Sequence, residues 1–556
     1  MPSNVLLLVI AFVGCSVAAP TDPASRSVDP TITLDHGTFT GANSGAINSF
    51  LGIPFALPPL DDLRFQLPRP NAPYTGTHNA TAFGHSCIQQ SSTVPIPSGL
   101  DPVAIQFLES SGGSTATSDS EDCLTVNVVA PADATVKSKL PVVVWIYGGG
   151  FEDGSSSTFN GSAIVQRSLD LKVPVIFVSL NYRYIISLSS LALGFLDGKE
   201  VREAGIGNLG LQDQRLALRW IQKYISTFGG DPRKVTIWGE SAGAISVALQ
   251  MLTNGGNTEG LFRAAFMQSG SPIPNAGTIG TAQTHFDQLV DNTNCTTSED
   301  KLACLRKVPL DTLRSGINAS PSLFSFNSLE LAWTPRNDGT FLRDTPMNLV
   351  LQGSVANIPF ITGDCDDEGT LFSLSNANLT TDDEVHDYMS TVYLQGASSS
   401  SIDKLLELYP QDPAQGSPFD TGDLNQVTPQ FKRLAAIQGD IVFQAPRRFF
   451  LNNRSARQKT WSFLSKRLKA LPDFGSVHGS DISNVFGPGD MTDYLIRFAA
   501  FLNPNGATGI AWPQYDVYSR QLLTFLDGDV PLTLTSDTYR KEQMEFVTEL
   551  SLAAPA

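Results

Sequence analysis

The stretch KVTIWGESAG, residues 234–243, decides the fold of this chain, because it joins a strand-like run to a Gly-x-Ser-x-Gly pentapeptide. The residues up to Trp238 favour a strand, and the following AISVALQMLT (Ala244–Thr253) can form a helix. A strand, a sharp turn and a helix make a nucleophile elbow, in which a serine hydroxyl projects above the strand end at a helix N-terminus. The alternative is a glycine-rich turn with no chemical role. We take Ser241 as the candidate nucleophile.

The segments on both sides of the elbow predict a parallel sheet. Leu209–Gly230 has the spacing of an amphipathic helix that ends in two glycines. A strand, a crossover helix and a strand at this spacing indicate parallel pairing. No linker divides the chain, so we expect one α/β domain over residues 20–556, with a large, mostly parallel central sheet flanked by helices. Six short, largely apolar runs favour strands: Pro141–Gly148, Val173–Tyr182, Lys234–Gly239, Phe262–Gly270, Ile358–Gly363 and Thr460–Leu464.

Composition and the N-terminus predict an exported protein. The 556 residues are 41% hydrophobic and carry a net charge of −17, which argues against disorder and against nucleic acid as a partner. An apolar run, Val5–Val13, followed by small residues predicts a signal peptide over residues 1–19, and it is too short to span a membrane. We therefore expect a secreted, extracellular glycoprotein. Its N-x-S/T acceptors are Asn79, Asn160, Asn294, Asn318, Asn378 and Asn453.

Five cysteines remain after the signal peptide, so at most two disulfides and one free thiol are expected. Nearest-neighbour pairing would join Cys87 to Cys123 and Cys295 to Cys304, and would leave Cys365 free. The spacings do not match a metal site, and the sequence predicts no metal and no organic cofactor.

A second glycine-rich segment can stabilise negative charge beside a nucleophile. Tyr147–Phe151 reads YGGGF and follows a predicted buried strand. Its glycine N–H groups are unobstructed and can point toward a developing oxyanion, with the N–H of Ala242 as a further donor. A flexible loop is the alternative.

A serine nucleophile also needs a base and an acid. In the order typical of this elbow, the acid and then the histidine follow the serine, which leaves His285, His386 and His478. His478 lies in a Gly/Ser loop after a predicted strand, where a catalytic imidazole is expected. The acid stays open among four carboxylates of GDCDDEGT (Gly363–Thr370), which could equally form a solvated loop or, with less regular spacing than usual, a cation site.

The chain resembles the type-B carboxylesterase/lipase family, which has the α/β-hydrolase fold and includes secreted fungal lipases. The resemblance runs from about Ile32 to Val547. It rests on LGIPFALPPLDDLRF (Leu51–Phe65), SEDCLTVNV (Ser120–Val128), GGGF (Gly148–Phe151), GNLGLQDQRLALRW (Gly207–Trp220), FGGDPRKVTIWGESAG (Phe228–Gly243), GDCDDEGTLF (Gly363–Phe372) and FGSVHGSD (Phe474–Asp481).

The resemblance assigns roles that the residues alone leave open. It implies a triad and a set of oxyanion donors, the same two disulfides, and an ion pair of Arg64 with Glu121 or Asp122. The connection after Arg183, near Tyr184–Leu191, is longer than the family pattern. The implied triad is Ser241, Glu368 and His478, and the implied donors are Gly149, Gly150 and Ala242.

Lipase-like members of this family carry a lid between the first two cysteines, here residues 88–122. Within it, Asp101–Ser110 predicts a helix with Asp101 as its N-cap. Its apolar face, Val103, Ala104, Phe107 and Leu108, could cover a hydrophobic pocket and open in transient contact with a lipid interface. The alternative is a helix packed permanently on the core.

The expected activity is hydrolysis of hydrophobic carboxylic esters through an acyl-serine intermediate. Two alternatives stay open: a narrower esterase for short, aromatic or sterol esters, and a non-catalytic binding protein on the same scaffold. Acyl preference and oligomeric state are left open by the sequence.

Overall fold

The computed structural model describes residues 29–90, 93–111, 117–183, 194–272, 279–487 and 489–553. The predicted signal peptide and the additional residues Tyr184–Leu191 lie outside the described residues. None of the described helices is long and apolar enough to cross a membrane.

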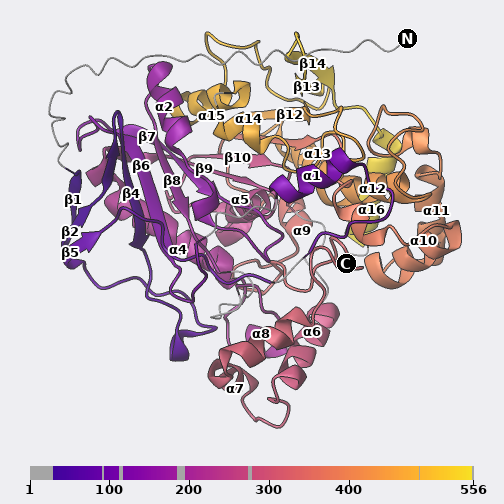
Figure 1. Cartoon of the computed structure of the whole chain (residues 1–556), viewed down its shortest axis with the longest axis horizontal. Coiled ribbons are helices and arrows are strands. Elements are labelled where there is room, and N and C mark those ends of the chain that lie inside the picture. Colours follow the sequence, from indigo (N-terminus) through magenta and orange to yellow (C-terminus); the bar gives the residue numbers. More distant parts are fainter. Residues whose placement is uncertain are drawn as a thin grey trace, which may run out of the picture.

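An eleven-stranded sheet, in the order β14-β13-β12-β11-β10-β9-β7-β8-β6-β4-β3, runs through the molecule (Figure 1). From β8 to β13 all neighbouring strands pair in parallel. The predicted α/β fold with a mostly parallel sheet is therefore confirmed. The six predicted strands are β7 (Leu140–Ile146), β8 (Ile176–Leu180), β9 (Gly230–Glu240), β10 (Ala264–Gln268), β11 (Phe360–Cys365) and β12 (Thr460–Lys466).

The strands that the sequence analysis did not predict lie at the margins. Within the sheet they pair antiparallel, β13 with β14 at one side and β8-β6-β4-β3 at the other. A separate three-stranded sheet lies near the N-terminus. These strands are β1 (Thr31–Leu34), β2 (His36–Thr40), β3 (Ala42–Ser44), β4 (Ile47–Pro54), β5 (Thr75–Asn79), β6 (Thr125–Pro131), β13 (Gln521–Leu526) and β14 (Leu532–Ser536).

Helices cover both faces of the sheet. One set, α2 (Ser162–Asp170), α14 (Ile482–Phe486) and α15 (Asp490–Phe501), packs over β6 to β9. The other set includes α5, which packs on β7, β9 and β10, and lies lower in Figure 1. This second set is α4 (Leu209–Tyr224), α5 (Ala242–Leu252), α9 (Pro346–Leu351) and α13 (Ala445–Arg454).

The predicted helix Leu209–Gly230 is shorter in the structure. It ends at Tyr224, a 3₁₀ turn follows over Ile225–Phe228, and Gly229 has a φ of 92°. β9 begins at Gly230, because the chain must reverse there to enter the sheet.

The remaining helices form two groups beside the sheet (Figure 1). One projects from it and contains α6 (Ile279–Asn292), α7 (Lys301–Lys307) and α8 (Leu310–Asn318), with α3 (Lys199–Glu203) against α7. The other has its own apolar core, separate from the core around the sheet, and we call it the helical cluster. Its helices are α10 (Asp382–Tyr388), α11 (Ser399–Leu408), α12 (Phe431–Gly439) and α16 (Lys541–Ala553).

Covalent and ionic links follow the sequence expectations. The structure contains the Cys87–Cys123 and Cys295–Cys304 disulfides, and Cys365 is a buried free thiol. Arg64 pairs with Glu121, at 2.9 Å and 3.2 Å, and it also donates to two backbone carbonyls before α8. The buried ion pair thus ties the first disulfide to the projecting helices.

Candidate active site

Ser241 lies in the turn between β9 and α5, as the elbow predicts. Its φ of 55° and ψ of −128° are strained for a residue with a side chain, and its N–H donates to the carbonyl oxygen of Gln268 at 2.9 Å. The flanking glycines are required by space: a Cβ on Gly243 would lie 2.0 Å from the Ile146 carbonyl oxygen, and one on Gly239 would lie 2.4 Å from the carbonyl carbon of Gly243. The two glycines of the pentapeptide are therefore needed because the turn packs closely against β7.

The structure brings the predicted serine, histidine and glutamate together. His478 Nε2 lies 2.8 Å from Ser241 Oγ, and His478 Nδ1 lies 2.5 Å from Glu368 Oε2. The other oxygen of Glu368 accepts the backbone N–H of Cys365 at 2.6 Å. This arrangement places the Nδ1 proton toward the carboxylate and leaves Nε2 free to accept the serine proton.

Glu240 is a second carboxyl group beside the imidazole, and Oε1 lies 3.3 Å from His478 Nε2. Burial raises the pKa of Glu240 to about 8, with repulsion from Asp481 and Glu368 acting in the same direction. Burial alone would lower the pKa of His478, but attraction to Glu368 and Glu240 outweighs it and raises the pKa to about 9. When Glu240 keeps its proton, part of that attraction is lost, so a protonated Glu240 favours the neutral imidazole.

The glycine loop, Tyr147–Gly154, follows β7 and lies against Ser241. A Cβ on Gly148 would lie 2.8 Å from Ser241 Cβ, and Gly149 and Gly150 have φ values of 100° and 63°. The N–H of Ala242, the first residue of α5, has no acceptor within its helix. The predicted donor residues Gly149, Gly150 and Ala242 all line the same cavity as Ser241.

This cavity has a volume of about 370 Å³ and a largely apolar wall. Its volume and lining suit an aliphatic chain bound next to Ser241. The apolar wall is formed by Phe151, Ile245, Leu323, Phe324, Leu329, Leu331, Leu371, Phe372, Val442, Phe443 and Ile482.

Each of the four carboxylates of the acid loop, Gly363–Thr370, has its own set of protein partners. Glu368 accepts from His478, and Asp364 binds Arg447 at 2.7 Å. Asp366 pairs with Lys469 at 2.6 Å and with a second lysine at 3.3 Å. The loop is therefore neither a solvated surface nor a cation site, since all four of its carboxylates bind cationic side chains or the imidazole.

Asp367 fixes the distance between the acid loop and the histidine loop, Asp473–Asp481. Its carboxylate accepts the backbone N–H groups of Ser476 and Phe419, both at 2.8 Å, and pairs with Lys469 at 2.7 Å. A single bridge also joins the backbones of Asp367 and Val477. These contacts hold His478 opposite Glu368.

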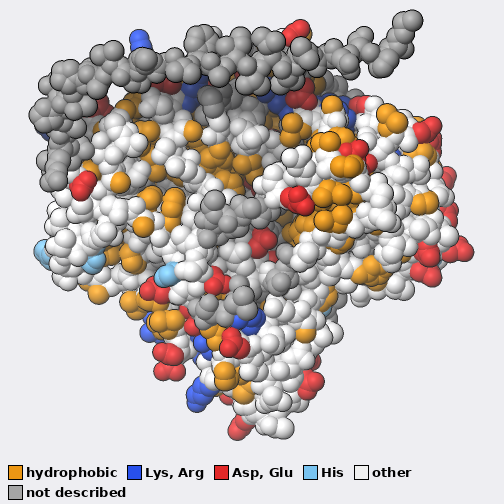
Figure 2. All heavy atoms as spheres, in the orientation of Figure 1, with side chains coloured by type: hydrophobic (Ala, Val, Ile, Leu, Met, Phe, Trp, Pro, Cys, Tyr) orange, Lys and Arg blue, Asp and Glu red, His pale blue; other side chains and the backbone are white. Residues whose placement is uncertain are grey.

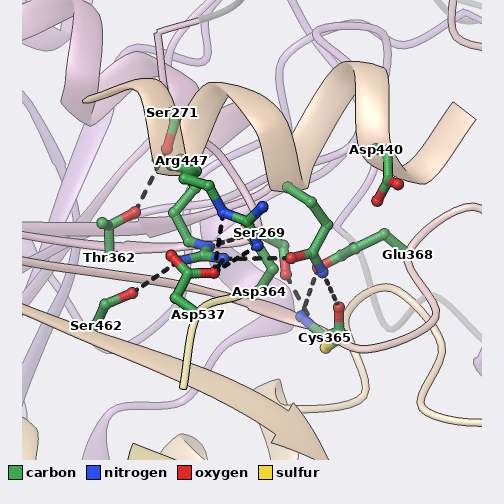
Figure 3. A network of polar contacts seen from close by, with 12 residues as sticks. Ser269, Ser271, Thr362, Asp364, Cys365, Glu368, Asp440, Arg447, Ser462 and Asp537 are labelled. Atoms are coloured by element: carbon green, nitrogen blue, oxygen red, sulfur yellow. Dashed lines mark hydrogen bonds and ion pairs between the residues drawn. The ribbon is translucent and has the colours of Figure 1, made fainter. Parts of the chain in front are cut away.

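A buried network behind the acid loop supports it from α13 (Figure 3). Arg447 is fully buried and donates to Asp364, to Ser462 Oγ at 3.0 Å, and to Asp537 at 2.9 Å and 3.0 Å. Gln444, one turn earlier, donates to the carbonyl oxygen of Cys365 at 2.7 Å. Helix α13 thus contacts the end of β11, just before Glu368, through both a side chain (Asp364) and the backbone (Cys365).

The other two histidines that follow Ser241 have different surroundings. His285 lies on α6 beside Trp333, and burial lowers its pKa to about 4. His386 lies on α10, 3.5 Å from Asp403. Among the described residues that line the Ser241 cavity, the histidine is His478.

Comparison with protein families gives a direct assignment. The model of the carboxylesterase family matches residues 28–547. This chain belongs to the carboxylesterase family. Membership identifies it as a carboxylic ester hydrolase, which argues against the non-catalytic binding protein.

Several relatives of this carboxylesterase are named as fungal lipases. Lipase 4 of Diutina rugosa is 44% identical over 88% of this chain and 90% of its own length. A secreted triacylglycerol lipase of Gibberella zeae is 38% identical, over 95% of this chain and 92% of its own. The solved structure of Aspergillus niger EstA superposes with a TM-score of 0.80 at 27% identity, and the match covers 96% of this chain and all of EstA.

The helix of the candidate lid is α1 (Pro102–Ser111), and Asp101 caps it by accepting the N–H of Val103 at 2.8 Å. Ala104, Phe107 and Leu108 pack into a small cluster with Phe474 beside the histidine loop. The prediction that Val103 shares this face is wrong. Val103 is 52% exposed, because it precedes Ala104 by one residue and therefore lies about 100° away from it around the helix. The described residues that line the Ser241 cavity all lie outside 88–122.

Sequence reasoning did not identify three further residues of the site. Glu240 could have been singled out by its place inside the pentapeptide, but its proximity to His478 depends on the fold. Asp481 accepts from Gln268 at 2.8 Å, and burial raises its pKa to about 6. Asp153 lines the cavity next to the glycine loop.

Proposed function

We propose that Ser241 is the nucleophile of this carboxylesterase, His478 its general base and acid, and Glu368 the group that orients the imidazole. The observation that carries the proposal is the continuous contact from Ser241 Oγ through His478 to Glu368, at 2.8 Å and 2.5 Å, at the wall of an apolar cavity. Gly149, Gly150 and Ala242 are the proposed oxyanion donors.

The reaction proceeds in two displacements. Ser241 Oγ attacks the ester carbonyl carbon while His478 Nε2 takes its proton, and the oxyanion accepts hydrogen bonds from the glycine loop. His478 returns the proton to the leaving alcohol oxygen, which gives an acyl-serine. Water, deprotonated by His478, then attacks the acyl carbon, and the acid leaves as Ser241 recovers its proton.

The favoured substrates in this proposal are hydrophobic esters of medium or long acyl chains. Support comes from the apolar wall of the cavity and from relatives named as lipases. A narrower preference for short, aromatic or sterol esters is the competing possibility, and the substrate series described below separates the two.

We further propose that the chain is cleaved after residue 19, secreted as one catalytic domain, and contacts lipid surfaces transiently. Secreted relatives support the export. Five of the six glycosylation acceptors, all except Asn453, are exposed. On the segment between Cys87 and Cys123, Ile96 and Val103 are 55% and 52% exposed, and Figure 2 shows hydrophobic side chains gathered near α1.

Labelling with a fluorophosphonate tests the assignment of the nucleophile. We expect the wild type to be labelled and Ser241→Ala to be unlabelled, while Ser246→Ala, a buried serine on the same helix, keeps its label. Labelling of folded Ser241→Ala, or no labelling of the folded wild type, would contradict the proposal.

Hydrolysis of p-nitrophenyl esters of increasing chain length, below and above their solubility limits, tests the substrate class. We expect kcat/KM to rise from short to medium or long acyl chains. A maximum at acetate or butyrate, with no gain above the solubility limit, would favour the narrower esterase.

A further inference from the structure

Asp153 presents a carboxyl group to the Ser241 cavity at the end of the glycine loop. Its backbone N–H donates to the carbonyl oxygen of Gly149 at 3.0 Å, which closes a tight turn. Across the described part of the chain, no hydrogen bond or ion pair reaches the carboxylate oxygens of Asp153. Burial raises its pKa to about 6. A half-buried carboxyl group without a protein partner, at the wall of a largely apolar cavity, is available to bind a ligand group.

The carboxyl group also lies against Gly149, one of the proposed oxyanion donors. Asp153 Oδ1 would be 2.2 Å from a Cβ on Gly149, so it occupies the space that this glycine leaves free. Gly148, the preceding residue, packs against Ser241. A substrate held at the glycine loop therefore brings its groups within reach of Asp153.

Other charged groups in or beside this cavity have protein partners. Arg336 donates to the carbonyl oxygen of Ala332 at 3.0 Å, and Glu152 accepts the N–H of Leu323 at 2.7 Å. Glu240 lies 3.3 Å from His478. Glu152 Oε1 and Arg336 Nε are also without a partner among the described residues, but those side chains are anchored through their other polar atoms. Asp153 differs from them because neither of its carboxylate oxygens is engaged by the described part of the chain.

We propose that Asp153 binds a hydroxyl group of the substrate, so that this carboxylesterase favours esters that carry a free hydroxyl near the scissile bond. The inference rests on the proposed function, because it assumes reaction at Ser241. A hydroxyl satisfies the carboxylate, whereas a methyl in the same place leaves it buried and unpaired, and sites of this kind discriminate strongly. A neutral hydroxyl fits the apolar wall better than an ammonium group, whose desolvation is costly.

Matched ester pairs test the proposal. On the alcohol side, 2-hydroxyethyl octanoate and propyl octanoate differ by a hydroxyl in place of a methyl. On the acyl side, ethyl 3-hydroxyoctanoate and ethyl 3-methyloctanoate differ in the same way. The measured quantity is the ratio of kcat/KM within each pair, per active site titrated with a fluorophosphonate, so that misfolded enzyme does not contribute.

We expect a ratio of about tenfold or more in favour of the hydroxyl in at least one pair for the wild type. Asp153→Leu should bring that ratio close to one, and Asp153→Asn, which keeps one acceptor, should give an intermediate value. Asp133→Asn, at an exposed carboxylate in the turn after β6, should match the wild type. The pair that responds identifies which side of the ester Asp153 contacts.

The pH dependence gives a second readout. A carboxylate accepts more strongly than a carboxylic acid, so the responding ratio should rise as the pH increases through about 6 and should stay flat in Asp153→Asn. Other ionisable groups act on both esters of a pair and cancel in the ratio. Those that adjoin Asp153 or line the cavity are Glu152, Tyr182, Glu240, Glu330, Arg336 and His478.

Equal ratios in the wild type and Asp153→Leu for both pairs would overturn this inference while leaving the proposed function intact. Absence of hydrolysis and of labelling in the folded wild type would instead overturn the proposed function, and this inference with it.

Discussion

The elbow and the acid loop both deliver a side chain to His478, but they are held in different ways. At the elbow, the residues that permit the turn lie within the pentapeptide, because Gly239 and Gly243 let the backbone pack closely against β7. In the acid loop, the partners come from distant segments, such as Arg447 on α13 and Lys469 before the histidine loop. A nucleophile can thus be encoded within ten residues, whereas its acid depends on the assembled fold.

The sharpest test of this contrast compares two of the four carboxylates of the acid loop. Glu368→Gln should lower kcat by about ten-thousandfold, because the amide no longer orients and stabilises the imidazolium. Asp366→Asn should change kcat less than tenfold, since that carboxylate pairs with surface-facing lysines. Steady-state kinetics on one p-nitrophenyl ester measure both. Comparable losses in the two variants would show that Glu368 has no special role.

The steric basis of the elbow can be broken at Gly243. Gly243→Ala should lower the free energy of unfolding by about 3–5 kcal/mol, because its Cβ would meet the Ile146 carbonyl oxygen at 2.0 Å. Gly260→Ala is the control: it has a φ of 73° and open space, so it should cost about 1 kcal/mol. Urea unfolding measures the difference. Equal losses would mean that backbone conformation, and not close approach, sets the elbow.

The long-range connection of the acid loop can be weakened at Asp367. Asp367→Asn should destabilise the fold by about 2 kcal/mol, because the contacts of its carboxylate with two N–H groups and Lys469 lose their charge. It should also lower kcat more than it raises KM, since it displaces His478 and not the cavity wall. Thermal unfolding and kinetics measure the two effects. A change in KM alone would contradict this interpretation.

The smallest expected effect is on the pH dependence of stability, and it concerns the carboxylate of the elbow itself. The folded pKa of Glu240, about 8, lies above its unfolded value, so the folded state binds more protons and stability falls as the pH rises from about 5 to 8. The raised pKa of His478 acts in the same direction toward pH 9. Glu240→Gln should reduce the fall by about 1–2 kcal/mol.

Urea midpoints between pH 5 and 9 check this, with Glu203→Gln on exposed α3 as the matched control. A wild-type midpoint that rises with pH over this range would show that the proton on Glu240 is not retained.

The same contrast explains what the sequence could predict. The six apolar strands and the elbow depend on local pattern, and the structure has them where the pattern indicates. The edge strands such as β3 and β14 are short and partly exposed, so no continuous apolar run marks them. The helix from Leu209 was predicted too long. The helical spacing of apolar residues continues through the 3₁₀ turn Ile225–Phe228, so the sequence does not mark the end of the helix at Tyr224.

Within the site, the residues alone indicated Ser241, the glycine loop and His478. The choice of Glu368 among the four carboxylates of the acid loop came from the family resemblance. Four adjacent carboxylates have the same local chemistry, and what distinguishes them is a partner far along the chain. The surroundings of Glu240 and Asp153 could not be predicted from the sequence for the same reason. Burial and the absence of a hydrogen-bond partner are properties of the folded chain.

The two sides of the cavity belong to different apolar cores. Ser241 and Ile245 stand over the central sheet, whereas Leu323, Phe372 and Phe443 belong to the helical cluster. Their resistance to heat therefore need not be equal. If warming loosens the helical cluster first, the enzyme stops turning over while the core around the sheet stays packed, and cooling restores activity without refolding the whole chain.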